Sequence, residues 1–432
     1  MEPSKYLFEA NFRYDGSSRF AEGNQWGFFP SLSVGWRLDQ EDFLASQDWV
    51  SALKLRGSYG VLGNQDIPNF SYVNLIQTGH EYLFGGNVGS GVAVTSFRDP
   101  NITWETTKIS NLGIDASLLN NRFDITIDLY DKRTDDILRP VNLPAQVGNL
   151  GGPIKNIGSV KNVGLDLGIT HRNRVGSLDY GINLGLNYNI NEVTNLNGEI
   201  IYGGNKFITL EGYPIDSYFV LESDGLFQSE AEIEANPFQN ITTKPGYIKY
   251  VDQNNDNVIN SDDRKVTGSV LPDYTYSFGF DLSYRRFSLN AFFQGVKGVN
   301  TYPEAIIAMP FWFATSVTER WANESWTPER PNAPLPILTS YEDSQNDNFL
   351  TSDFWLLDAS YLRLKNIQLG YTVPERFLSK IGVSRCMFFV NGQNVLTFSK
   401  MNDFDPERNV KQANYYEYPS VKMYTAGINL TF

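Results

Sequence analysis

The sequence predicts an all-β protein: an antiparallel transmembrane β-barrel segment with long extracellular loops. Three observations predict it: strands of period two that are apolar on one face, an aromatic share of 14%, and a last strand that ends on Phe432. Outer-membrane barrels alternate lipid-facing and lumen-facing residues and carry aromatic girdles at both membrane interfaces. An aromatic-rich soluble β-sandwich is the alternative that composition leaves open.

The stretch 273–296 has the clearest pattern. Apolar residues take alternate positions over 274–284, and the phase reverses after Arg285-Arg286. Each strand is about 10 residues long, enough to cross a bilayer at the usual tilt. A two-residue turn makes this stretch a transmembrane hairpin and gives the pairs Tyr284 with Phe287, Leu282 with Leu289, Phe280 with Ala291 and Asp281 with Asn290.

The same alternation predicts further strands along the chain. The longest, 178–190, keeps Asn183 and Asn187 on a polar face over a length that a soluble sandwich seldom sustains. We expect the Gly-rich segment 79–91 to be a flexible loop, because it lacks the strand-to-helix context of a phosphate loop. Segments 195–265 and 298–353 are expected to be long irregular loops. The other predicted strands are 6–12, 29–38, 53–60, one through Ile114, 123–129, 163–169, 361–371, 386–396 and 421–432.

Composition excludes several classes of protein. The net charge of -14 argues against nucleic-acid binding, which needs a basic surface. The single Cys386 excludes a disulfide framework, and His80 and His171 are too few for a histidine metal centre or a Ser-His triad. No run of 18 apolar residues exists, so no transmembrane helix is expected. Residues 1–14 do not resemble a signal peptide, so we expect either a cytoplasmic chain or one whose real beginning is missing.

The segment 252–263 copies the spacing of an EF-hand calcium loop, which makes Ca²⁺ the one cofactor predicted. Asn257 stands where the loop usually has glycine, and Asn tolerates the left-handed backbone required there. Asp263 replaces the usual bidentate Glu. The alternative is an Asn- and Asp-rich surface turn. The predicted oxygen ligands are Asp252, Asn254, Asp256, Val258 (through its carbonyl), Asn260 and Asp263.

No catalytic residue is predicted, so the chain is not expected to be an enzyme. The carboxylate pairs Asp135-Asp136, Glu222-Asp224 and Asp403-Asp405 have no nucleophile beside them, which favours solvated pairs over acid-base catalysis. The loop tryptophans either stack on sugar rings or contact a partner, or else pack within their own loop; these are Trp312, Trp321 and Trp326.

Several short motifs run in order from one end of the chain to the other. With them the chain resembles the carboxy-terminal part of the β-barrel of SusC/RagA-like TonB-dependent outer-membrane transporters of Bacteroidetes. The motifs are Asp15-Gly16-Ser17-Ser18-Arg19-Phe20, Trp26-Gly27-Phe28-Phe29-Pro30-Ser31, Leu55-Arg56-Gly57-Ser58-Tyr59-Gly60, Gly63-Asn64-Gln65, Trp104-Glu105-Thr106-Thr107, Thr134-Asp135-Asp136-Ile137-Leu138, Asn156-Ile157-Gly158, Asn162-Val163-Gly164, Ser360-Tyr361-Leu362-Arg363-Leu364-Lys365-Asn366, Gly370-Tyr371-Thr372-Val373-Pro374, Asn391-Gly392-Gln393-Asn394, Asp405-Pro406-Glu407 and Tyr418-Pro419.

The resemblance implies a place in the cell outer membrane, in contact with its lipid, and TonB-dependent import of oligosaccharides or peptides. A SusD-like lipoprotein would act as lid, and TonB, ExbB and ExbD would act through a plug. Family members begin with a signal peptide, a TonB box and a plug; none is found here, so we expect a truncated or split product. The alternatives are a surface glycan-binding or adhesin-type β protein without transport, and an outer-membrane barrel enzyme. Alternation and loop position would make the passage lining Asp281, Asn290, Asn183, Asn187, Trp312 and Trp321.

Overall fold

β-Strands dominate the computed structural model. It describes residues 4–44, 46–141, 143, 146, 151–303, 309–312, 316–340, 347–378, 382–401, 404–407, 411 and 418–432. Hydrogen bonding joins twelve strands into one sheet in the order β1-β2-β3-β6-β7-β10-β11-β18-β19-β22-β23-β24. Their bounds are β1 (Tyr6–Gly16), β2 (Trp26–Arg37), β3 (Val50–Asn64), β6 (Glu105–Leu118), β7 (Phe123–Asp135), β10 (Ser159–Val175), β11 (Leu178–Asn195), β18 (Tyr274–Tyr284), β19 (Phe287–Lys297), β22 (Tyr361–Thr372), β23 (Arg385–Ser399) and β24 (Met423–Thr431).

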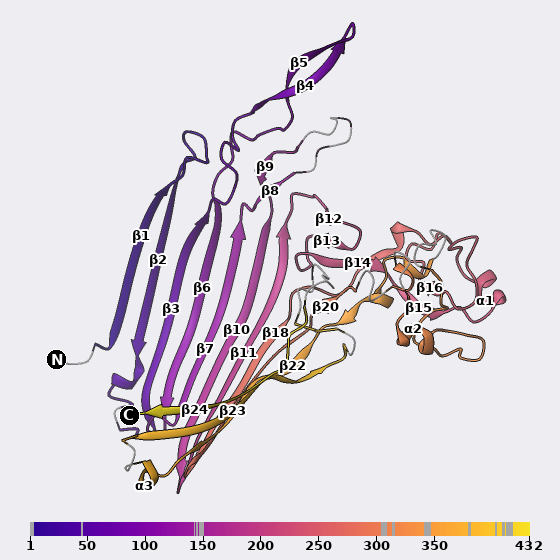
Figure 1. Ribbon diagram of the computed structural model, residues 1–432. Coiled ribbons are helices and arrows are strands. Elements are labelled where there is room, and N and C mark those ends of the chain that lie inside the picture. The colour runs from indigo at the N-terminus through magenta and orange to yellow at the C-terminus, as the bar shows by residue number, and fades with distance from the viewer. Residues whose placement is uncertain are drawn as a thin grey trace. The chain divides into compact units, whose positions relative to one another are not determined.

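The chain divides into two compact units. The first comprises Met1–Arg172, Gly185–Glu199 and Leu210–Tyr213, and the second comprises Asn173–Leu184, Ile200–Thr209 and Pro214–Phe432. Strands β1, β2, β3, β6, β7 and β10 of the first unit run side by side and pair antiparallel (Figure 1). Within the described ranges, helices are short, and none is long and apolar enough to cross a membrane.

One face of the first unit is apolar and exposed. Tyr6 and Tyr14, near the two ends of β1, stack on Trp36 and Trp26 of β2 with ring centroids 6.4 and 5.0 Å apart. The polar tips of Tyr6 and Trp36 both donate to Glu41 at 2.9 Å. Aromatic rings at both ends of strands whose apolar side chains are exposed are typical of a surface surrounded by lipid. The apolar side chains between the ring pairs are Phe8, Phe12, Phe28, Leu32 and Val34.

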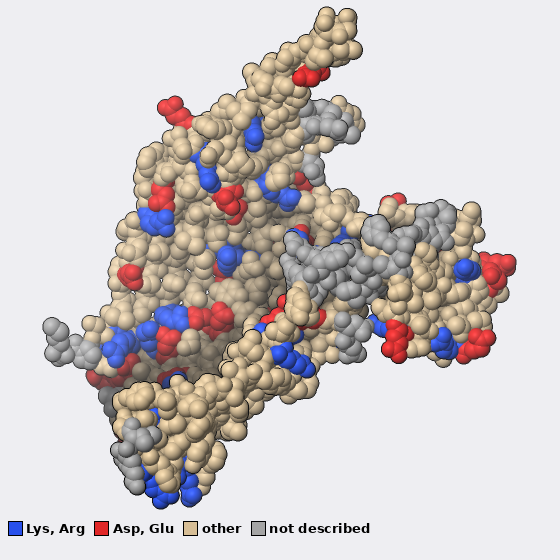
Figure 2. Space-filling view, viewed as in Figure 1, with Lys and Arg blue, Asp and Glu red and all other residues tan. Residues whose placement is uncertain are grey.

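The opposite face of the wall is polar. Over the broad sheet, Figure 2 shows basic side chains lying beside acidic ones on the face in view. On β3 and β6 of the first unit, Lys54 forms an ion pair of 2.8 Å with Asp115. Alternation along each strand therefore separates a lipid-compatible face from a hydrophilic one, as the sequence predicts.

The wall strands of the second unit confirm the predicted hairpin register. Tyr284 pairs with Phe287, and Asp281 pairs with Asn290. Arg285 adopts φ 56° in the two-residue turn, the left-handed conformation that tight hairpin turns require. The apolar face of this unit is again exposed, through Phe278, Phe287, Leu369, Phe388, Val390 and Ile428.

Connections between strands alternate between short and long. Residues 119–122 and 285–286 are short turns, whereas 65–104 and 298–360 are long loops. Outer-membrane barrels have short periplasmic turns and longer extracellular loops. The long loops are therefore the extracellular ones.

The expectation of a flexible loop at 79–91 is wrong. Strands β4 (Ile76–Phe84) and β5 (Asn87–Val94) pair as a hairpin within loop 65–104. Its large apolar side chains, including Tyr82 and Phe84, are exposed on both faces of the hairpin. The frequent glycines concealed the alternation of this hairpin in the sequence.

The two longest loops of the second unit fold together. Loop 200–273 contributes β12 (Ile201–Gly203), β13 (Phe207–Thr209), β14 (Ser217–Leu221), β15 (Ser223–Leu226), α1 (Glu230–Ala235), β16 (Ile248–Tyr250) and β17 (Arg264–Val266). Loop 298–360 contributes β20 (Asn300–Thr301), α2 (Glu319–Glu324) and β21 (Leu357–Asp358). They share one core, made of Phe207, Tyr218, Val220, Leu221, Ile248, Tyr250, Ile259, Val270, Tyr302, Trp321, Leu335 and Trp355.

Candidate ligand passage on the polar face and the long loops

The predicted lining residue Asp281 lies in a hydrogen-bonded group of three. Asn290 on β19 donates its amide to Asp281 Oδ1 at 2.5 Å, and Asn183 on β11 donates to Oδ2 at 3.5 Å. Both amide donors therefore hold one carboxylate on the polar face of the second unit. The structure thus brings together three of the four wall residues that alternation predicts to line the passage.

The fourth predicted wall residue, Asn187, belongs to a different group in the first unit. It donates to Asp166 Oδ1 at 2.5 Å and to the Tyr130 hydroxyl at 3.4 Å, and that hydroxyl donates to Asn189 Oδ1 at 3.1 Å. Tyr130 reaches from β7 to β11 by crossing Gly164 on β10, where a Cβ atom would lie 2.3 Å from the hydroxyl. Sequence reasoning named Tyr130 only beside the motif Thr134-Asp135-Asp136-Ile137-Leu138 and predicted neither Tyr130 nor Asp166 as a passage residue, although the register places Tyr130 directly opposite Gly164.

Arg56 connects three strands in the first unit. From β3 it donates to Asp115 on β6 at 3.1 Å and to Asp128 Oδ2 on β7 at 2.6 Å. Gly113 lies between Arg56 and Asp128 in the register and leaves room for the guanidinium. Both carboxylates accept hydrogen bonds from the guanidinium, so the three charges can lie in a partly buried position on the wall.

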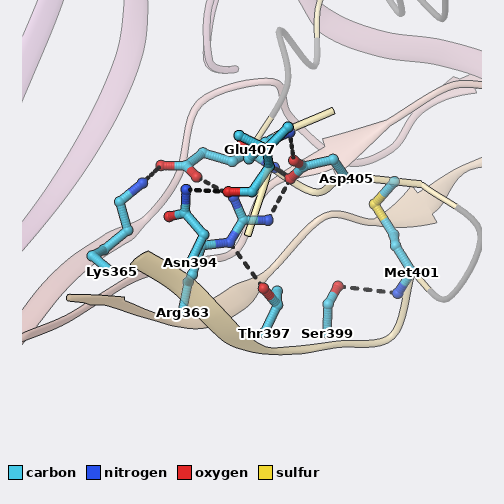
Figure 3. Close-up of polar contacts among 10 residues, drawn as sticks. Arg363, Lys365, Asn394, Thr397, Ser399, Met401, Asp405 and Glu407 are labelled. Atoms are coloured by element: carbon cyan, nitrogen blue, oxygen red, sulfur yellow. Dashed lines mark hydrogen bonds and ion pairs between the residues drawn. The ribbon is translucent and has the colours of Figure 1, made fainter. Parts of the chain in front are cut away.

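Arg363 lies on β22, close to the end of loop 298–360. Among the described residues it belongs to the most buried ion pair. Its guanidinium donates to Asp405 Oδ1 at 2.5 Å, to Glu407, and through Nε to Thr397 Oγ1 at 2.9 Å (Figure 3). Lys365 donates to Glu407 Oε1 at 2.6 Å. The Arg363 and Asp405 side chains are only 5% and 6% exposed.

A β-bulge places Arg363 on the polar face. Simple alternation along β22 would put Arg363 and Lys365 on the lipid face with Ile367 and Leu369. In the register with β19, however, Phe292 pairs with Asn366 and Phe293 with Leu364, so Lys365 is an extra residue. A one-residue insertion reverses the facing of every residue beyond it. Arg363 therefore points to the polar side.

Asp405 has a depressed pKa. Burial acts to raise the pKa of its carboxyl, but the Arg363 guanidinium and the backbone N–H groups of Glu407 and Ser420 outweigh burial and lower it to about 2. The carboxylate therefore stays charged at any physiological pH. Its predicted pair partner Asp403 lies outside the described residues, and sequence reasoning did not find Arg363 as the partner of Asp405.

Three of the other carboxylates singled out as pairs face cations. Asp135 accepts from Lys108 at 3.0 Å, Glu222 lies 2.5 Å from Lys265, and Asp224 lies 2.9 Å from Lys249. These three carboxylates are therefore members of ion pairs.

The loop tryptophans differ in environment. Trp321 and Trp326 are buried, Trp321 against Trp355 with ring centroids 6.0 Å apart, and Trp326 with its Nε1 donating to Gln228 at 3.0 Å. Both therefore pack within the loops. Trp312 lies half-buried in the short described segment 309–312.

A cavity of about 800 Å³ lies beside helix α2 in the second unit. Aromatic side chains line its floor, with Trp321 and Phe354 among them, and charged side chains such as Arg320, Glu324 and Lys400 stand around it. This volume and this mixture of apolar and polar side chains are typical of small-molecule sites. The remaining lining residues are Pro303, Thr318, Glu319, Asn323, Pro334, Leu335, Trp355, Leu357, Met401 and Phe404.

The segment 252–263 is a turn held by its own hydrogen bonds. Asp252 accepts from the backbone of Asn255 and Asn257 at 2.7 and 2.8 Å, and the buried Asp263 accepts from Gln253 and Asn260 at 2.9 and 2.8 Å. Asn257 has φ 65°, the left-handed conformation expected at that position.

Burial acts to raise the pKa of the Asp252 carboxyl, but the backbone donors of Asn257 and Asn255 lower it overall. Among the residues that the structure describes, no three His, Cys, Asp or Glu side chains gather as they would around a metal. Calcium binding by Asp252, Asn254, Asp256, Val258, Asn260 and Asp263 stays a prediction.

Comparison with known proteins agrees with this architecture. The family model described as "TonB dependent receptor-like, beta-barrel" matches residues 1–395. TonB-dependent receptor P3 of Formosa agariphila is 31% identical, over 99% of this chain and 44% of that protein. TonB-dependent receptor SusC of Bacteroides thetaiotaomicron is 28% identical, over 99% of this chain and 42% of that protein.

Solved structures give the same result. A structure of the RagAB peptide transporter matches with a TM-score of 0.81 and 26% identity, covering 99% of this chain and 46% of that chain. The RagAB peptide importer in its open-open state matches with a TM-score of 0.80 and 26% identity, covering 99% and 45%. The chain spans less than half the length of the relatives that it matches.

An exposed apolar face, a polar opposite face and long loops on one side define an outer-membrane β-barrel protein. The chain belongs to the TonB-dependent receptor β-barrel family, and its matched relatives include SusC and the RagAB structures. The resemblance found in the sequence motifs is thereby confirmed, as are the β-barrel fold and the outer-membrane location.

Proposed function

We propose that this chain forms ligand-passage wall and extracellular loops of a TonB-dependent importer of oligosaccharides or peptides. One observation carries the proposal: a polar wall face and a folded two-loop unit with a cavity occur in a chain that matches the RagAB transporter over 99% of its length. The import itself involves no bond chemistry, only binding and gated passage.

The partners follow from the same reasoning. A SusD-like lipoprotein would close the extracellular side over the long loops, and TonB with ExbB and ExbD would supply energy from the periplasmic side. The names SusC and RagAB support this assembly for the relatives. For this chain the assembly is part of the proposal.

Uptake by cells tests the proposal. Cells that produce the protein carrying this chain are compared with deletion cells for internalisation of fluorescently labelled maltohexaose and of a labelled decapeptide. We expect one labelled ligand to enter only when both the protein and TonB are present. Surface binding without entry would instead support the glycan-binding or adhesin alternative.

Co-purification tests the partner. A lipoprotein that copurifies with the protein in mild detergent, and whose deletion abolishes uptake of the same ligand, is the expected result. Undiminished uptake without any associated lipoprotein would contradict the proposal that a SusD-like lipoprotein closes the extracellular side.

A further inference from the structure

The segment 400–407 of the β23–β24 loop is described at residues 400, 401 and 404–407, and it contacts the wall through Asp405 and Glu407. Asp405 and Glu407 receive the two terminal nitrogens of Arg363, and Glu407 also receives Lys365 (Figure 3). Asp405 Oδ2 accepts a further bond from the backbone of Ser420 at 2.8 Å. The Asp405 carboxylate therefore binds both the wall strand β22, through Arg363, and the later part of the same loop, through Ser420.

The strand is distorted in order to make this attachment. The extra residue Lys365 turns Arg363 to the polar face, and Asn394 on β23 adopts φ 52° beside the register shift between β22 and β23. A bulge and a left-handed residue both weaken regular pairing. Burying an ion pair rarely adds net stability over apolar packing, so specific positioning is the better reason for it.

The proximal end of the segment contacts the base of a long loop. Met401 packs against Val299 and Ala359, which begin and end loop 298–360. Lys400 forms an ion pair of 3.2 Å with Asp358. The segment thus joins the Arg363 group to the two ends of that loop.

The segment also forms one wall of the cavity beside α2. Lys400, Met401 and Phe404 line it from this side, facing Arg320 and Trp355 of loop 298–360. The shape of the cavity consequently depends on where Lys400, Met401 and Phe404 are held.

We propose that Arg363 is the positioning residue of segment 400–407, and that by fixing this segment it sets the cavity through which the imported ligand is engaged. The second half of this inference rests on the proposed import function, whereas the first half does not. Arg363 acts through Asp405 and Glu407 and contacts no ligand itself.

Hydrogen exchange measured by mass spectrometry tests the positioning. In the detergent-solubilised protein, R363M is expected to speed exchange of residues 400–407 and 358–360 at least tenfold and to leave the β18–β19 hairpin unchanged. R363K, which keeps the charge but not the planar fork, is expected to give a smaller increase. D405N is the second variant if R363M does not fold, and it is expected to speed exchange of the same residues.

Arg56 supplies a matched control, because it also holds two carboxylates across the wall but no loop. R56M is expected to leave exchange at 400–407 unchanged. Unchanged exchange there in both R363M and D405N, or an equal increase throughout the wall, overturns the positioning role.

Uptake kinetics test the link to the ligand. With the labelled ligand that the wild-type protein imports, R363M is expected to raise KM at least fivefold while the maximal rate changes less than twofold. Faster exchange with an unchanged KM overturns the link to the cavity. If the wild-type protein imports neither labelled ligand, the proposed function fails, and the exchange result still decides the role of Arg363.

Discussion

Substitution of Gly113 by alanine should break the three-strand contact made by Arg56. In the register Gly113 separates Arg56 on β3 from Asp128 on β7, and the guanidinium crosses directly over it. A Cβ atom at Gly113 would lie 2.5 Å from Arg56 Cζ and 2.8 Å from Asp128 Oδ1. Both distances are far below van der Waals contact, so the guanidinium has to withdraw from Asp128.

The structure gives the size of the effect. Withdrawal removes the two hydrogen bonds between Arg56 and Asp128, and hydrogen bonds to charged groups contribute about 1.5–3 kcal/mol each. The Arg56 side chain is 30% exposed, so water replaces part of the loss. We therefore expect G113A to lower the free energy of unfolding by about 2 kcal/mol.

The change in the free energy of unfolding is measured by urea unfolding of the barrel protein in lipid vesicles, followed by tryptophan fluorescence. Gly168 on β10 provides the matched control, because a Cβ there would meet only Thr126 Cβ, at 3.9 Å. G168A should be neutral or slightly stabilising. In an R56A background G113A should cost nothing further. A G113A protein as stable as G168A, or full additivity with R56A, would refute the reasoning.

Three further predictions concern the loops. The folded pKa of Asp405, about 2, lies below its ordinary value of 3.8, so its stabilisation is complete above about pH 4 and is lost as pH falls through 2. Segment 400–407 should therefore resist protease at pH 4 and lose that resistance as pH falls through 2, and D405N should abolish the resistance at pH 4. Burial raises the pKa of Asp347, whose hydrogen-bond partners Asn240 and Thr243 are neutral. The loops should therefore become more stable as pH falls from neutrality through that raised pKa. Thermal unfolding followed by near-UV circular dichroism measures this pH dependence, and D347N should remove it. Calcium binding by 252–263 requires Ca²⁺ to slow amide exchange in that turn and D252N to prevent it; equal exchange with Ca²⁺ and with chelator would contradict it.

The wall was predictable because its pattern is local. Along β18 and β19 the period of two and a two-residue turn leave one register that buries no charge, and the observed pairs are the predicted ones. The position of a bulge does not follow from such reasoning, because it requires the register of both neighbouring strands. The signal for it was present: Arg363 and Lys365 share the parity of Ile367 and Leu369, an arrangement that would place two cations against lipid.

The loop unit was not predictable, because its contacts are distant in sequence and follow no period. The backbone of Ile248 donates to Asn348 Oδ1 at 2.9 Å, and the Tyr250 hydroxyl donates to the Asp347 carbonyl at 2.7 Å. Each segment alone reads as irregular, and only their pairing produces a core. The candidate cavity, which is lined by loop 298–360 and by residues of the β23–β24 loop, escaped sequence reasoning for the same reason.

Glycines beneath crossing side chains recur on this wall. Arg56 crosses Gly113, Tyr130 crosses Gly164, and Tyr276 crosses Gly295, where a Cβ would lie 2.7 Å from the ring while the hydroxyl donates to the Tyr361 carbonyl at 3.0 Å. Each long side chain thereby links its own strand to the second strand along. Backbone hydrogen bonds join only adjacent strands, so these crossings resist shear between strands that do not touch. We therefore expect these crossings to keep the polar face of the wall in a fixed shape.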